Sequence, residues 1–179
     1  MSDTADAADW GEDFDALMAG VDQPLVIVTT ASGEVKAGCL VGFHTQCGME
    51  PVEYAVWLSK ANHTYRVAAL SEHFGVHFLS KEHHDLAALF GGETQEHVDK
   101  FAQCRWSVGP EGVPLLDRVQ NRFVGRREAW LDPGADHACL VLRPISAAYS
   151  GDFEPLRIDD VGDIDAGHDA QERQRPQDP

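Results

Sequence analysis

Apolar residues along the chain mostly occur in short runs or in alternation with polar residues, the patterns typical of β-strands. The segment 24–30 (PLVIVTT) is rich in β-branched residues and predicts a buried strand, and Ala31-Ser32-Gly33 predicts the turn that follows it. The same patterns predict further strands over residues 35–41, 52–58, 73–79, 119–131 and 138–149.

Helical spacing of apolar residues is confined to short segments. These predict helices over residues 12–20, 64–70, 83–90 and about 94–102, with Gly20 and Gly91-Gly92 as stop signals and Asn62 and Thr64 as caps of the second. The chain has no internal repeat, and its strands do not alternate regularly with helices. This order argues against a doubly wound sheet and for a mainly β protein, a β-barrel with short peripheral helices.

Composition narrows the class of protein. The chain has 179 residues, 43% of them hydrophobic, which is enough for the core of one domain. Acids outnumber bases 30 to 14, which disfavours a nucleic-acid-binding protein. No apolar run reaches the length of a membrane span, and Met1 is followed by an acidic segment rather than a basic signal peptide, so we expect a cytoplasmic protein.

The negative charge is concentrated at the two ends of the chain. Residues 1–22 hold seven acids and no base, and residues 152–179 hold nine acids and three arginines. We therefore predict an acidic N-terminal segment with a short helix, a nearly neutral folded domain over 23–151, and an acidic disordered tail over 152–179. Such a tail serves as a solubility device or an adaptation to salt, or it docks a basic partner.

Cysteines and histidines do not form a recognisable metal-binding motif. The four cysteines contain no CxxC pair, so neither a zinc site nor a disulfide framework is predicted. His73 and His77 are four residues apart but lie in a segment that alternates like a strand, which separates them from the helical zinc-binding pattern. We predict no metal site.

Two segments have the composition of ligand-binding sites. Residues 38–48 (GCLVGFHTQCG) combine glycines, which let the backbone approach a flat ligand, with hydrogen-bonding side chains, although an ordinary strand-to-loop junction has the same features. Residues 58–65 (LSKANHTY) place Lys60 beside a helix start, where backbone amides attract an anion, although a helix cap without a ligand fits equally well. A planar-ligand loop and an anion site together are more informative than either alone.

The order of motifs resembles the flavin reductase-like, FMN-binding split-barrel family. The resemblance covers roughly residues 23–150 and rests on the motifs PLVIVTT, GCLVGFHTQCG, LSKANHTY, FGVHFLSKEHHDLAALFGG, DKF and ADHACLVL, in this order. It implies a six-stranded split β-barrel of Greek-key type that forms a homodimer with flavin at the subunit interface. It also implies reduction of FMN or FAD by NADH or NADPH, which commonly supplies a partner monooxygenase.

The resemblance assigns site residues position by position. His137 matches the histidine near the nicotinamide, although Ala135 replaces the glycine of that motif, and Gly42 and Phe43 replace the usual serine pair. The flavin-binding residues implied by the resemblance are Gly42, Phe43, His44, Thr45, Gln46 and Cys47 along the ring, Lys60, Asn62 and Thr64 at the phosphate or ribityl chain, and His83, Phe90 and Lys100 elsewhere in the site.

The flavin would supply the redox chemistry, and the protein would position and tune it. Two other functions remain open: an FMN-binding electron carrier or sensor that does not turn over NAD(P)H, and an acidic interaction module that binds no flavin. The sequence also leaves open the choice of FMN or FAD, of NADH or NADPH, of bound or diffusible flavin, and the identity of a partner oxygenase.

Overall fold

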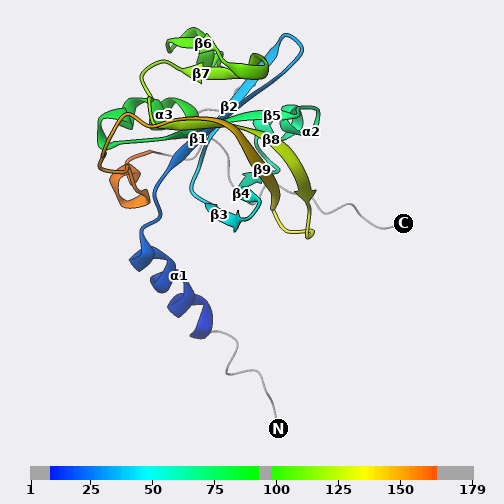
Figure 1. Ribbon diagram of the computed structural model, residues 1–179. Helices are drawn as coiled ribbons and strands as arrows, with labels where there is room; N and C mark the ends of the chain where they lie inside the picture. Colours follow the sequence, from blue (N-terminus) through cyan, green and yellow to red (C-terminus); the bar gives the residue numbers. More distant parts are fainter. Residues whose placement is uncertain (1–8, 93–97, 165–179) are drawn as a thin grey trace.

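The computed structural model describes residues 9–92 and 98–164, which form a mainly β protein, as predicted. One antiparallel sheet has seven strands in the order β2-β1-β5-β8-β9-β4-β3, and β6 and β7 pair separately (Figure 1). The strands are β1 (Val26–Ser32), β2 (Val35–Val41), β3 (His44–Met49), β4 (Val52–Ser59), β5 (His73–Phe78), β6 (Trp106–Val108), β7 (Pro114–Leu116), β8 (Arg122–Leu131) and β9 (His137–Ala148).

The two edge strands of the large sheet, β2 and β3, are consecutive along the chain. Only Gly42 and Phe43 separate them, so the end of one edge and the start of the other lie within about 11 Å. Phe43 already pairs with β4, because its carbonyl accepts a hydrogen bond from the Trp57 amide at 2.9 Å. The sheet therefore curves until its two edges approach each other at this junction.

Two helices cover the sheet and one stands apart from it. α2 (His63–Ala69) and α3 (His84–Gly91) contact β2 and bury Ala68 and Phe90, respectively. α1 (Asp9–Val21) projects away from the body, as Figure 1 shows, and its large apolar residues are exposed. The remaining helical elements are the 3₁₀ turns η1 (Lys81–His83), η2 (Lys100–Ala102), η3 (Pro110–Gly112) and η4 (Ile158–Val161).

The core has two main clusters, one on each side of the curved sheet. The first includes Val28, Phe74 and Leu140, and the second surrounds Ile27 and Leu116. Fully buried His77 joins strands near the second cluster, because its Nδ1 donates to the Ile27 carbonyl at 3.1 Å and its Nε2 accepts from the Leu116 amide at 3.1 Å. Burial lowers the pKa of His77 to about 3, so it is a neutral structural residue.

Most predicted elements are present with small shifts at their ends. β2 has the predicted bounds, whereas β3 lies where a loop was expected. The predicted helix over 94–102 is wrong in its described part, since residues 98–102 contain only the turn η2; residues 93–97 lie outside the described residues. The Asp99 carboxylate caps this turn by accepting from the amides of Phe101 and Ala102, and the chain then leaves the helical conformation.

The first half of the expected acidic tail is packed rather than disordered. We call residues 152–164 the strap. Leu156 is 1% exposed and belongs to the second core cluster. Its backbone bonds to Leu25 and Leu79, with N–O distances of 2.8 and 2.9 Å. The tail prediction is therefore wrong for the strap, and residues 165–179 lie outside the described part of the chain.

Candidate functional site

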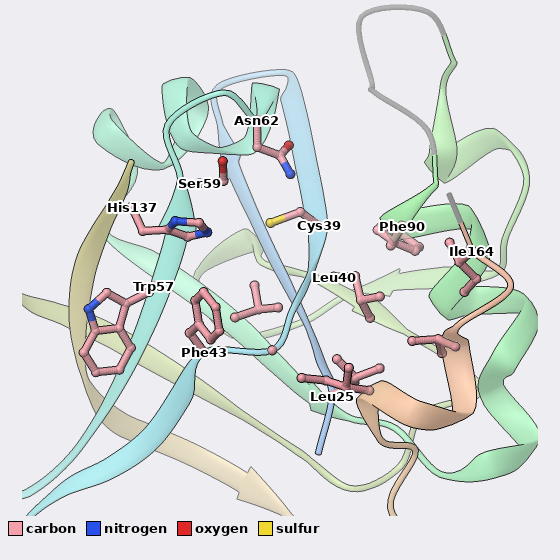
Figure 2. A pocket seen from close by; sticks show the side chains of 15 residues that line it. Leu25, Cys39, Leu40, Phe43, Trp57, Ser59, Asn62, Phe90, His137 and Ile164 are labelled. Atoms are coloured by element: carbon pink, nitrogen blue, oxygen red, sulfur yellow. The ribbon is translucent and has the colours of Figure 1, made fainter. Parts of the chain in front are cut away.

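A cavity of about 390 Å³ lies at the junction of β2 and β3, where the curved sheet opens. This volume is within the range of about 300–1,000 Å³ typical of small-molecule sites. Figure 2 shows its lining residues, which come from the residue before β1, β2 and the β2–β3 junction, β4, the N-cap of α2, α3, β9 and the strap. They are Leu25, Cys39, Leu40, Val41, Gly42, Phe43, Trp57, Ser59, Asn62, Phe90, Gly91, His137, Ile158, Val161 and Ile164.

One end of the cavity is aromatic and polar. β4 and β9 place Ser59 opposite His137 in the strand register, and Phe43 lies edge-on to the His137 ring with 5.3 Å between centroids. The Asp136 carboxylate lies 2.9 Å from His137 Nδ1 and fixes the direction of the imidazole. Trp57 lines the same end (Figure 2). This end can stack on a planar ring and hydrogen-bond to its polar edge.

The start of α2 lies beside this end. Asn62 is the N-cap residue, and its side-chain oxygen accepts a hydrogen bond from the Thr64 amide at 3.1 Å. Thr64 itself is fully buried and lies outside the lining of the cavity. Burial raises the pKa of neighbouring Cys39 to about 11, so this thiol is neutral and adds an apolar contact rather than a charge.

The opposite end of the cavity is aliphatic. Leu25 and Leu40 lie there with three residues of the strap, Ile158, Val161 and Ile164. A Cβ atom added at Gly42 would lie 3.5 Å from Ile158, so any larger side chain at position 42 would compete with a ligand for this space. The glycine therefore keeps the junction between the two ends open.

Phe90 forms part of the wall and is held from behind by Lys100. Lys100 is 1% exposed, and its ammonium group donates to the Phe90 carbonyl at 2.9 Å and lies 5.6 Å from the centre of the Phe90 ring. A Cβ atom added at Gly38 would come within 2.7 Å of that ring. Phe90 thus has little freedom to move, and Lys100 acts behind the wall of the cavity.

The structure brings Gly42, Phe43, Asn62, Phe90 and His137 to the cavity. The next four predicted residues, 44–47, do not line it, because β3 leaves the cavity after Phe43. The His44 ring is engaged on both nitrogens, since Nε2 donates to the Pro24 carbonyl at 2.8 Å and Nδ1 accepts from the Tyr54 hydroxyl at 2.6 Å. The other three, Thr45, Gln46 and Cys47, are exposed on the edge strand.

Lys60 and His83 also lie outside the lining of the cavity. Lys60 forms an ion pair with Asp132. His83 is 6% exposed; its Nδ1 accepts from the Ser80 amide, and its Nε2 lies 3.1 Å from the Arg118 carbonyl. The side chains of Lys60 and His83 are therefore engaged in contacts within the fold.

Several lining residues were not predicted from the sequence. Trp57 and Ser59 alternate with Leu58 in β4, so a period-two reading of the strand predicted over 52–58, extended by one residue, could have placed both on one face. Leu25 and the strap residues gave no such signal. The strap approaches the cavity through contacts with residues more than 70 positions away in the sequence, such as Leu79 and Leu25.

Within the described ranges, 9–92 and 98–164, neither a metal-binding cluster nor a membrane-spanning helix is present. These residues contain no group of three or more His, Cys, Asp or Glu side chains arranged to hold a metal ion. None of the helices in the same ranges combines the length and the apolar character needed to cross a membrane.

The fold is mainly β, and its cavity has one aromatic, polar end and one aliphatic end. The chain belongs to the flavin reductase like domain family, whose model matches residues 18–158. It is similar to "FMN reductase (NADH) SmoA" of Agrobacterium fabrum, with 32% identity over 134 residues that cover 74% of this chain and 72% of SmoA. It is also 30% identical over 112 residues to "FMN reductase (NADH) RutF" of Stutzerimonas stutzeri, covering 63% of this chain and 64% of RutF, just under two thirds of that relative.

Solved structures share the fold. The flavin reductase domain protein from Arthrobacter sp. FB24 matches with a TM-score of 0.73 and 20% identity, covering 82% of this chain and 89% of that one. The NADH:FAD oxidoreductase SgcE6 of Streptomyces globisporus C-1027 matches with a TM-score of 0.70 and 20% identity, covering 80% and 87%. At these identities the likeness concerns the fold alone.

The cavity fits the flavin that the family implies. Its aromatic end offers ring faces for stacking and polar groups for the edge of an isoalloxazine, and the glycine at position 42 leaves the middle of the cavity free for a flat ring. Asn62 lines the cavity at the start of α2, the end of a helix whose dipole favours a phosphate.

Proposed function

We propose that the protein is an NAD(P)H-dependent flavin reductase that transfers a hydride to FMN or FAD. The observation that carries this proposal is the cavity at the β2–β3 junction, which combines an aromatic face, polar groups and a helix start in a chain of the flavin reductase like domain family. The relatives named FMN reductase (NADH) support the same reaction class.

The lining residues bind and orient the ring. Phe43 and Trp57 provide aromatic surface, and the Gly42 backbone allows close approach of the ring. Phe90 closes one wall, and Lys100 holds it there while adding positive charge behind it. Bound flavin would supply the hydride acceptor, so no side chain need act as a proton base in the transfer.

His137 is assigned to the nicotinamide side of the site. Its ring lies beside Phe43, and its contact with Asp136 limits rotation of the imidazole. A fixed imidazole at the rim can orient a dinucleotide relative to the ring below it. The Asp136–His137 pair thus positions the donor, while Asn62, with Lys60 and Thr64 near it in sequence, belongs to the phosphate or ribityl side.

The barrel and the assembly of the protein are part of the same proposal. We infer that six of the seven strands of the curved sheet form the split barrel of the family and that the protein works as a cytoplasmic homodimer. Phe43 is 57% exposed, which leaves the aromatic end open for a second copy to cover. Thr45, Gln46 and Cys47 lie beside this opening on the edge strand β3, where their backbone could meet the ring in the dimer. A flavin-dependent monooxygenase is the proposed consumer of the reduced flavin.

The test is NADH and NADPH oxidation by the purified protein with and without added FMN or FAD. The proposal predicts oxidation that depends on flavin and, without oxygen, bleaching of the flavin absorption. Flavin binding without bleaching would instead favour the electron carrier or sensor. The observation that favours this alternative is Ala135, which replaces a glycine of the family motif beside His137. Absence of flavin binding would contradict both functions.

A further inference from the structure

The strap forms one wall of the cavity. Its backbone pairs with the chain that leads into β1, since the Ile158 amide donates to the Gln23 carbonyl at 3.1 Å and the Leu156 carbonyl accepts from Leu25 at 2.8 Å. Figure 1 shows it beside this segment. The position of its apolar residues is therefore set by hydrogen bonds to the body of the protein.

Side-chain contacts link the strap to the body of the protein at both of its ends. Lys81 contacts the Glu154 carboxylate at 2.8 Å, and His84 Nε2 lies 2.9 Å from the Asp163 carboxylate. Between them, the Arg157 guanidinium donates to the Asp22 carbonyl at 2.7 Å. Two of the acidic residues that suggested a solvated tail thus contact the folded body.

The two ends of the cavity differ in the polarity of their lining side chains. Figure 2 shows Ile164, Leu40 and Leu25 on one side, and His137 and Ser59 on the other. No charged or hydrogen-bonding side chain contributes to the aliphatic end among the described lining residues. A ligand edge buried there must therefore be apolar, because an unpaired polar group would lose its hydrogen bonds to water.

An isoalloxazine ring has the same asymmetry. Its dimethylbenzene edge carries no hydrogen-bonding group, whereas its pyrimidine edge alternates donors and acceptors. We propose that Ile158, Val161 and Ile164 of the strap receive the dimethylbenzene edge and so set the direction in which the flavin lies. This inference rests on the proposed function. Val161 and Ile164 lie beyond residue 158, the last residue matched by the family model, so the family match does not assign a role to them.

The test compares FMN with an analogue that lacks the two ring methyl groups, didemethyl-FMN, by quenching of flavin fluorescence. Burial of two methyl groups predicts that the wild-type protein binds FMN about tenfold more tightly than the analogue. In Ile164→Ala and Val161→Thr variants this ratio should fall to about threefold or less, because the apolar wall is reduced or made polar.

Matched controls keep the test specific to the strap. Ile145→Ala and Val52→Thr make the same changes on exposed strand positions, 46% and 51% exposed, and should leave the ratio at the wild-type value. The Val161→Thr change keeps the side-chain shape, so it reports on the wall even where Ile164→Ala reduces stability.

The outcomes separate this inference from the proposed function. A wild-type ratio near one, or a ratio that the strap variants do not change, would overturn the inference while FMN binding and NADH oxidation still supported a flavin reductase. Failure of the wild-type protein to bind FMN at all would overturn the proposed function, and the inference with it.

Discussion

The two ends of the cavity are built in different ways. The aromatic end comes from β4, β9 and the β2–β3 junction, where ladder hydrogen bonds fix neighbouring residues such as Ser59 and His137. The aliphatic end depends on the strap, a short segment held by a few backbone bonds and by ion pairs at the surface. The sheet thus supplies the end with specific polar chemistry, and a terminal segment supplies the apolar wall.

The largest expected effect is on the anchor of the strap. Leu156→Ala should lower the free energy of unfolding by about 2–5 kcal/mol, because it leaves a cavity in the second core cluster. Urea denaturation measures this change. Leu17→Ala on α1, where the side chain is 65% exposed, is the matched control and should cost less than about 0.5 kcal/mol. Equal costs at both positions would mean that the strap is no better packed than α1.

A change at the aromatic end should affect turnover more than stability. His137→Ala should slow NADH oxidation about tenfold, the effect of one lost hydrogen bond to a charged or strongly polar group, with FMN affinity nearly unchanged. Steady-state kinetics and a flavin titration of the same variant separate the two effects. His73→Ala, on β5 and outside the cavity lining, is the control. Equal losses of turnover and of flavin affinity would argue against the nicotinamide role.

The smallest expected effect concerns the start of α2. Asn62→Ala removes the cap of α2 and should weaken binding of FMN about threefold to tenfold, with a smaller effect on riboflavin, which has no phosphate. Asn62→Ser keeps an oxygen that can cap the helix and should restore most of the affinity. Titration of both flavins checks the prediction, and a loss that is equal for FMN and riboflavin would remove Asn62 from the phosphate side.

The sequence predicted the strands that carry strong β patterns. The run at 35–41 has the bounds of β2, and the helix start at Asn62 is where the structure places it. It did not predict β3 (His44–Met49), because glycine and polar residues on an edge strand give no apolar alternation. The local pattern of apolar residues was sufficient to predict a strand where one face of that strand is buried along its length.

The site was predicted in part for the same reason. Phe43 and His137 lie in motifs that are continuous in sequence, whereas the strap residues reach the cavity through pairing with distant segments. High acidic content made the strap appear solvated, although Leu156 is buried and the backbone of the strap bonds to the folded body. Net charge alone therefore did not distinguish a packed strap from a solvated tail.

The most direct test of the account is a crystal structure of the protein with FMN. We expect the isoalloxazine ring in the cavity between Phe43 and Leu40, with its dimethylbenzene edge against Ile164 and its polar edge toward Ser59 and His137. FMN bound elsewhere on the protein, with this cavity filled by solvent, would contradict the assignment of the site.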